Sequence, residues 1–295
     1  MKKNYIYAFL TVSIWSTTAA ITKLLLTDIP TLETLSISSF LAFFFLLAMN
    51  FKTGHIKKMK EFSFKDYSAM AGLGFLGLFM YSALYYYGLS ELSSQKACIL
   101  NYLWPIMIVI FSSVILKEKI TILKAAAMLS SFFGIIILSA KSLSSPSESS
   151  FLGIISCIAA AACYGLFSVL NKKADFDQNI AMMIIWLVTA VCAAILGAQT
   201  EDWVSLSGAQ WFGFLWLGIV IDAIAYLLWA LALKGSKDTS KIANLAYLVP
   251  FLSLLVSALL LKEQIELRSI LALVFIVGGI LLSNVYELFK AKIKK

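Results

Sequence analysis

The stretch NYLWPIMIVIFSSVILKEKI at residues 101–120 has a counterpart in AYLVPFLSLLVSALLLKEQI at residues 246–265. Each stretch contains Tyr-Leu-x-Pro, continues as a long apolar run and closes that run with Leu-Lys-Glu. Pro105 therefore corresponds to Pro250 at an offset of 145 residues, about half of the 295-residue chain. This pattern predicts that the two halves of the chain are related repeats.

The composition is typical of an integral membrane protein. Hydrophobic residues make up 61% of the chain and charged residues 14%, whereas roughly a quarter of a soluble domain is charged. Apolar runs of about 20 residues, long enough to cross a bilayer as a helix, recur along the sequence. The four cysteines lie within these runs without a Cys-x-x-Cys pair, so we interpret them as packing residues.

We expect an all-α integral membrane protein with ten transmembrane helices, arranged as two inverted five-helix repeats. The first repeat is predicted to cover residues 1–140 and the second residues 151–295, with a Ser-rich linker at 141–150. The expected spans are 5–26, 32–51, 67–88, 93–116, 121–140, 151–170, 179–199, 210–233, 240–261 and 267–286.

The distribution of Lys and Arg orients these spans. With the N-terminus in the cytoplasm, 19 of the 24 basic residues fall on the cytoplasmic side, in agreement with the positive-inside rule. Both termini are then cytoplasmic, and the net charge of +8 belongs to the membrane face and does not indicate a nucleic-acid partner. Five spans are an odd number, so the second repeat crosses the membrane in the opposite direction. Inverted repeats of this kind are typical of secondary transporters.

The sequence carries no motif of an enzyme or of an ATP-driven pump. It contains no nucleotide-binding glycine loop, no Ser/His pair and no metal-ligand cluster, and its single histidine, His55, lies in a basic loop. We therefore expect no enzyme activity, no cofactor and no metal. The single arginine, Arg268, opens the tenth span, which argues against phosphorylated substrates because Arg is the preferred bidentate phosphate ligand.

Several motifs carry a family resemblance. The stretches IWSTTAAITK at 14–23, AIAYLLWALAL at 223–233 and LAYLVPFLSLLVSALLLKEQI at 245–265 resemble the EamA family of the drug/metabolite transporter superfamily. NYLWP at 101–105 and VLNKKA at 169–174 are similar to the YddG-type aromatic amino acid exporters of that group.

The resemblance implies a basket-shaped fold in a bacterial cytoplasmic (inner) membrane. Spans 1, 3, 4, 6, 8 and 9 would line a central cavity, and spans 5 and 10 would be peripheral. It further implies the export of amino acids or other small metabolites by alternating access. The chain departs from the family pattern at Cys163-Tyr164, where a Trp is usual, and at Asp222, where small or hydroxyl residues are common.

Asp222 lies near the middle of the eighth span, where an ionisable residue needs water or a partner. Tyr226 and Trp229 follow it on the same helix face. Two functional roles fit such an acid: it couples transport to protons, or it binds a substrate ammonium. The alternative is a protonated carboxyl that hydrogen-bonds within the bundle and has only a structural role.

Further polar and aromatic residues on the cavity spans are candidates for substrate binding, with helix packing and interhelical hydrogen bonding as the alternative. The matched prolines Pro105 and Pro250 are expected to kink spans 4 and 9 and to act as hinges, or else only to shape packing. The candidate cavity residues are Trp15, Thr18, Tyr81, Asn101, Tyr102, Trp104, Tyr164, Asp222, Tyr226, Asn244 and Tyr247.

Together these patterns predict a secondary transporter that exports amino acids or similar small metabolites across the cytoplasmic membrane. Two alternatives stay open: a proton-coupled efflux pump for hydrophobic cations, and a membrane scaffold or sensor that transports nothing. The expected partners are a small-molecule substrate and membrane lipid, with the proton as a candidate coupling ion. The expected oligomeric state is a monomer or a weak dimer.

Overall fold

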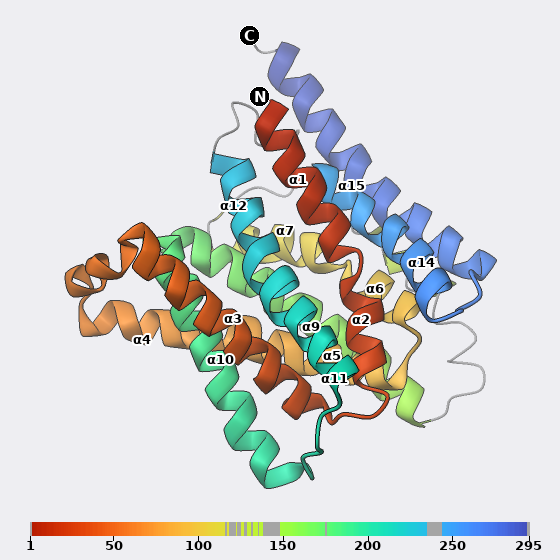
Figure 1. Ribbon diagram of the computed structural model, residues 1–295. Helices are drawn as coiled ribbons and strands as arrows, with labels where there is room; N and C mark the ends of the chain where they lie inside the picture. The colour runs from red at the N-terminus through yellow and green to blue at the C-terminus, as the bar shows by residue number, and fades with distance from the viewer. Residues whose placement is uncertain are drawn as a thin grey trace.

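The computed structural model describes residues 2–115, 148–174, 176–234 and 244–293, together with isolated positions between 117 and 137. All regular structure in these residues is helical, which confirms the predicted all-α fold (Figure 1). Seven described helices are long and apolar enough to cross a membrane: Asn4–Leu25, Thr31–Thr53, Phe64–Glu91, Ser94–Ile115, Phe151–Asn171, Gln178–Thr200 and Gly208–Trp229. Shorter apolar helices occupy Val249–Leu260 and Leu267–Gly279. The chain is a multi-pass membrane protein.

These helices correspond to all the predicted spans except the fifth. Half of the residues of the fifth span at 121–140, and the linker up to residue 147, lie outside the described residues. The helix that carries the sixth span, Glu148–Lys173, begins inside the expected linker, while the apolar span itself begins at Phe151, as predicted.

The first half contains α1 (Lys2–Trp15), α2 (Thr18–Leu25), α3 (Thr31–Thr53), the 3₁₀ helix η1 (His55–Glu61), α4 (Phe64–Leu73), the π-helix η2 (Gly74–Phe79), α5 (Met80–Glu91), α6 (Ser94–Asn101) and α7 (Trp104–Ile115). The second half contains α9 (Glu148–Lys173), α10 (Gln178–Thr200), α11 (Gly208–Leu215), the π-helix η3 (Trp216–Ala225), α12 (Tyr226–Lys234), the 3₁₀ helix η4 (Asn244–Leu248), α14 (Val249–Leu260) and α15 (Leu267–Ile293).

The first span is not one continuous helix, as was expected, but breaks between Trp15 and Thr18. At the break the Ser16 hydroxyl donates a hydrogen bond to a backbone carbonyl one turn earlier at 2.7 Å, and the Thr17 hydroxyl does the same at 2.7 Å. These bonds compete with regular helix geometry. Irregular backbone at membrane depth is tolerated where it is buried in protein or lines a cavity.

Pro105 and Pro250 lie directly after irregular segments. Pro105 is the second residue of α7, which follows a turn at 102–103, and Pro250 is the second residue of α14, which follows η4. A proline suits the first turn of a helix because its missing N–H has no helical partner there. The prolines therefore begin new helical segments and do not bend continuous ones. Their role as hinges stays a prediction.

Spans 3 and 8 share two features that the sequence analysis did not predict. Each begins with a capping box, which starts at Ser63 in span 3 and at Ser207 in span 8. Each then changes from α-helix to π-helix, at Gly74–Phe79 and at Trp216–Ala225. The two features occur in matched order, as expected of related repeats.

The Leu-Lys-Glu motifs share an unusual backbone conformation. Lys117 (φ 56°) and Lys262 (φ 55°) are the residues other than glycine with positive φ in the described chain, and such residues are uncommon. In the second motif the Glu263 carboxylate accepts hydrogen bonds from the backbone N–H groups of Ser94 (2.8 Å) and Gln95 (3.2 Å), at the start of α6. A carboxylate there stabilises the positive end of the helix dipole.

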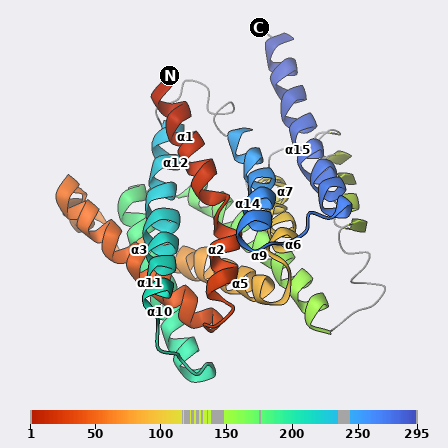
Figure 2. The ribbon, with the colours of Figure 1, turned by 45° about the vertical axis from the view of Figure 1, so that its right-hand side comes forward.

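The helices pack in pairs that join the two halves. α3 lies along α10, α9 packs against α5 and α7, and α1 packs against α12. α15 lies on the outside of the bundle, with the start of α1 and the end of α15 at the same end of the molecule in both views (Figures 1 and 2). The exposed apolar side chains of α15, which include Ile270, Leu271 and Val274, are typical of a surface that contacts lipid.

Carboxylates lie at both ends of α10. At one end Glu201, directly after α10, accepts hydrogen bonds from the backbone N–H groups of Leu32 (2.9 Å) and Glu33 (3.0 Å) at the start of α3. At the other end Asp177 caps α10 by accepting from the backbone N–H groups of Asn179 (3.0 Å) and Ile180 (3.4 Å). Both arrangements satisfy N–H groups that a helix start leaves free.

Asp177 also connects α10 to η1. Its Oδ2 lies 2.6 Å from Nζ of Lys58 and 3.2 Å from Nδ1 of His55. Partial burial acts to raise the pKa of Asp177, but hydrogen bonds from Lys58, Asn179 and His55 outweigh it and hold the pKa at about 2. Asp177 is therefore ionised at physiological pH and links the loop after span 2 to the start of span 7.

Candidate functional site

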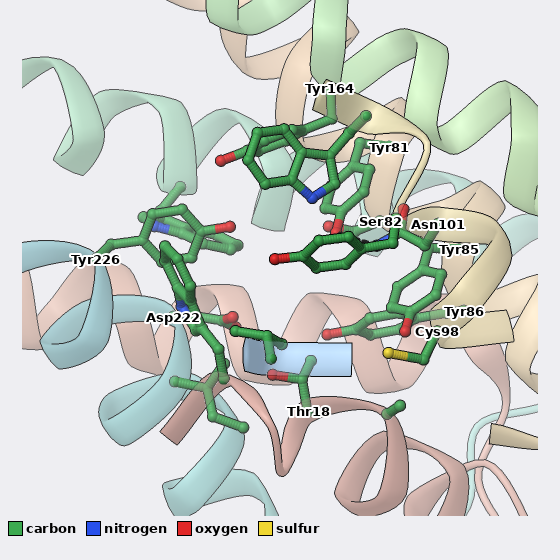
Figure 3. Close-up of a pocket in the computed structure, with 17 residues that line it drawn as sticks. Thr18, Tyr81, Ser82, Tyr85, Tyr86, Cys98, Asn101, Tyr164, Asp222 and Tyr226 are labelled. Atoms are coloured by element: carbon green, nitrogen blue, oxygen red, sulfur yellow. Dashed lines mark hydrogen bonds between the residues drawn. The ribbon is translucent and has the colours of Figure 1, made fainter. Parts of the chain in front are cut away.

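A cavity of about 100 Å³ lies between spans of both halves (Figure 3). Nine of the eleven predicted cavity residues line it, whereas the side chains of Asn244 and Tyr247 lie outside the described part of the chain. Substrate binding by these residues stays a prediction. The nine are Trp15, Thr18, Tyr81, Asn101, Tyr102, Trp104, Tyr164, Asp222 and Tyr226.

Sequence reasoning missed other lining residues. All six spans named by the family resemblance contribute, with Val249 from the ninth, and span 7 adds Trp186. Tyr85 and Tyr86 also line the cavity from span 3. Tyr85 could have been found, because it follows Tyr81 by one helical turn. Trp186 could not, because its position depends on how α10 packs against the other helices.

Irregular backbone carries several cavity residues. Trp15 and Thr18 flank the break in the first span, and Asn101 is the last residue of α6 before the turn in the fourth. Asp222 lies in the π-helix of the eighth span. π-Helical segments are rare and are frequently found at functional sites. Three of the interruptions thus coincide with the cavity, whereas the π-helix η2 (Gly74–Phe79) contributes no cavity-lining residue.

Asp222 is the only acidic residue among the described cavity-lining residues, which include no Lys, Arg or His. It is 6% exposed, and its Oδ2 has no hydrogen-bond partner in the part of the chain that the structure describes. The Ser38 hydroxyl on α3 interacts with the same carboxyl group. Because a buried carboxylate is costly without partners, a group that binds in the cavity beside Asp222 would stabilise its ionised form.

Gly218 allows η3, which carries Asp222, to pack closely against α3, which carries Ser38. It lies one turn before Asp222 on η3, and a Cβ atom added to it would come within 2.5 Å of the backbone oxygen of Ser38. The eighth span thus approaches α3 closely because residue 218 has no side chain.

Aromatic rings form much of the cavity wall. The Tyr226 ring lies 5.2 Å from that of Trp15 and 6.1 Å from that of Trp186, measured between centroids. Across the cavity, the rings of Tyr81 and Tyr164 are 5.0 Å apart. Such walls offer apolar contact area to a ligand and can also attract a cation over a ring face.

Four buried polar atoms of the wall have no hydrogen-bond partner among the described residues. They are the indole Nε1 donors of Trp15 and Trp186, and the acceptor oxygens Oδ1 of Asn101 and Oδ2 of Asp222. The amide nitrogen of Asn101 does have a partner, since it donates to the Tyr81 hydroxyl at 3.1 Å. Buried polar groups are normally paired. This set is therefore suited to a ligand that both donates and accepts hydrogen bonds.

The model of the EamA-like transporter family matches residues 2–140 and 151–285 of the sequence. The chain belongs to the EamA-like transporter family. This match confirms the resemblance seen in the sequence. The family has the two-repeat fold of the drug/metabolite transporters, and the chain shares that fold. In the described residues of this EamA-like transporter, no group of three or more His, Cys, Asp or Glu side chains could hold a metal ion.

This EamA-like transporter is similar to proteins named as transporters. It is 25% identical to the uncharacterized transporter YoaV of Bacillus subtilis over 281 aligned residues, and the alignment covers 92% of this chain and 93% of that protein. It is 27% identical to the aromatic amino acid exporter YddG of Ancylobacter novellus over 186 aligned residues, and the alignment covers 62% of this chain and 64% of that protein. A crystal structure of a protein with 21% identity has the same fold, with a TM-score of 0.72 over 97% of this chain and 98% of that one.

Proposed function

We propose that this EamA-like transporter exports aromatic amino acids or closely related small metabolites across the cytoplasmic membrane by alternating access. The observation that carries the proposal is the cavity, which combines aromatic walls with four polar atoms that have no hydrogen-bond partner among the described residues. Such a lining suits a substrate with an apolar body and a small polar head. The relative named as an aromatic amino acid exporter supports the same substrate class.

The size of the cavity supports a conformational cycle. At about 100 Å³ it is smaller than typical ligand sites, which occupy roughly 300–1,000 Å³. Entry of an amino acid therefore requires that lining side chains rotate or that helices from the two repeats separate. We place the repeats at 1–140 and 151–295. The start of α1 and the end of α15 lie at the same end of the molecule, which supports both termini on one side of the membrane. We place that side in the cytoplasm from the distribution of Lys and Arg.

Efflux from loaded cells tests this proposal. Cells that express the protein are loaded with labelled phenylalanine, tyrosine, tryptophan or leucine, and the loss of label is followed against vector-only cells. The proposal expects faster efflux of at least one aromatic amino acid. Equal efflux of all amino acids with and without the protein would refute it, and no flux in proteoliposomes would favour a scaffold or sensor.

A second candidate is proton-coupled efflux of hydrophobic cations, favoured by Asp222 as the only acidic residue in the described cavity wall, which includes no Lys, Arg or His. Resistance to toxic cations without any amino acid export would favour this function. In that case Asp222→Asn should abolish the dependence of efflux on external pH, because an amide cannot bind and release the coupled proton. Downhill exchange of substrate by the same variant should persist.

A further inference from the structure

The cavity has two chemically different ends. Asp222 and Tyr226 lie on one side, and Asn101 and Tyr85 lie on the other (Figure 3). We call the first the acidic end and include Trp15 and Trp186 in it, since both contact the Tyr226 ring. We call the second, with Tyr81, the amide end.

The acidic end matches an ammonium group. Oδ2 of Asp222 is an acceptor with no partner among the described residues, and it is held in a protein interior where an unpaired charge is costly. The rings of Trp15, Trp186 and Tyr226 next to it present faces that attract cations. A primary ammonium has three N–H donors and a positive charge. It can therefore donate a hydrogen bond to the Asp222 carboxylate and at the same time make cation–π contacts with the rings.

The amide end is neutral. The Oδ1 atom of Asn101 has no hydrogen-bond partner in the described part of the chain, and the rings of Tyr81 and Tyr85 stack with centroids 6.0 Å apart. The described wall of the cavity supplies no cation to a substrate carboxylate, which could accept only from neutral N–H and O–H groups. Among the described lining residues, the cavity thus has an acidic partner for an amine and no basic partner for an acid.

From this asymmetry we propose that Asp222 determines specificity by binding the ammonium of the substrate, and that the carboxylate is dispensable. The cavity then also accepts aromatic amines that lack a carboxylate, a substrate class beyond the amino acids. This inference rests on the proposed export function, because it concerns the same cavity. It places the aromatic ring of the substrate toward Tyr81 and Tyr164, away from Asp222.

Three indole compounds of similar size test the inference with the purified full-length protein. Tryptamine carries only the ammonium, indole-3-propionate carries only the carboxylate, and L-tryptophan carries both. Binding to a protein in detergent is measured from the concentration dependence of its thermal unfolding. The inference expects tryptamine and tryptophan to bind with similar Kd, and indole-3-propionate to bind at least tenfold more weakly.

Substitutions assign the effect to Asp222. Asp222→Asn should weaken tryptamine binding roughly tenfold to a hundredfold, since a hydrogen bond to a charged group contributes about 1.5–3 kcal/mol. Asp222→Glu should retain a substantial part of the affinity because it keeps the charge. Asp66→Asn, at a surface capping box, is the matched control and should bind like the wild type.

Several results would overturn the inference. One is equal binding of indole-3-propionate and tryptamine to the wild type, and another is binding of tryptophan without tryptamine. Unchanged tryptamine affinity in Asp222→Asn would mean that Asp222 has only a structural role beside Ser38. If Asp222→Asn does not fold, the comparison of ligands on the wild type decides alone. Binding of none of the three also overturns the inference, and the efflux assay then decides separately whether the export function fails.

Discussion

The rings of Trp15 and Tyr226 lie 5.2 Å apart in an edge-to-face arrangement and connect the first span to the eighth beside Asp222. Trp15 is the last residue of α1, directly before the break in that span, and its ring also lies 5.3 Å from that of Trp229. A movement of α1 relative to α12 therefore changes the cavity wall next to its one described carboxylate. Under the proposed function, this contact links helix motion to substrate binding.

Replacement of Trp15 should weaken substrate binding. We expect Trp15→Ala to cost about 2 kcal/mol, or roughly thirtyfold in Kd, because it removes both ring contacts and an indole donor from the wall. Trp15→Phe should have a smaller effect, since it keeps a ring. The Kd for an exported amino acid is measured on purified protein. The control is Trp211→Ala, on an exposed part of α11; if both Ala variants bind equally well, Trp15 does not contact substrate.

Replacement of Gly218 should destabilise the fold. A methyl group there would press against the backbone oxygen of Ser38, and overpacking of this kind costs about 1–3 kcal/mol. Gly72→Ala is the matched control, since no atom lies within 4 Å of its added Cβ. In a helix, Ala is favoured over Gly by about 1 kcal/mol. Thermal unfolding in detergent should therefore rank Gly218→Ala below the wild type and Gly72→Ala at or above it; the reverse order would contradict the close packing of η3 on α3.

The apolar runs were sufficient to place most helices. Spans predicted at 32–51 and 179–199 are observed as Thr31–Thr53 and Gln178–Thr200, because a bilayer-spanning run leaves little choice of ends. Nine of the aromatic and polar residues of the cavity were also predicted, since their side chains are unusual in apolar helices.

The interruptions were not predictable. A π-helix depends on a local change of hydrogen-bond register, which has no clear residue signature, so Trp216–Ala225 was expected to be α-helical. The contribution of Trp186 depends on the packing of α10 and not on its own sequence. The break after Trp15 follows from two hydroxyls, and Ser and Thr also occur inside continuous helices.

The ionised Asp177 should stabilise the protein in a pH-dependent way. Its pKa in the folded protein is about 2, below the ordinary value of about 3.9 for Asp. The stabilisation is therefore complete above about pH 5 and is lost progressively as the pH falls through about 3.9 toward 2. Asp177→Asn keeps the helix cap but loses the charge that pairs with Lys58, at a cost on the order of 0.5–1 kcal/mol.

Thermal unfolding from pH 7 to pH 3 measures this difference. Asp177→Asn should unfold below the wild-type temperature at pH 7, by an amount that is constant down to about pH 5 and then shrinks. Asp202→Asn, an exposed position, should follow the wild type throughout. A difference that stays the same at pH 3 would show that the charge of Asp177 is not the cause.

The paired prolines should affect the rate of transport more than affinity. Ala at position 105 or 250 would allow the helix to extend back into the irregular segment before α7 or α14, which stiffens spans 4 and 9. We expect Pro105→Ala and Pro250→Ala each to slow turnover several-fold with a change in Kd below twofold. Transport at the parental rate by both variants would mean that the prolines only begin helices.

Exchange in proteoliposomes tests the central claim most directly. Purified protein is reconstituted in vesicles filled with unlabelled tryptophan, and uptake of labelled tryptophan from outside is followed without a proton gradient. The account predicts rapid exchange by the wild type, competition by external tryptamine but not by indole-3-propionate, and little exchange by Asp222→Asn. Uptake no faster than in protein-free vesicles, for tryptophan, phenylalanine and tyrosine alike, would contradict it.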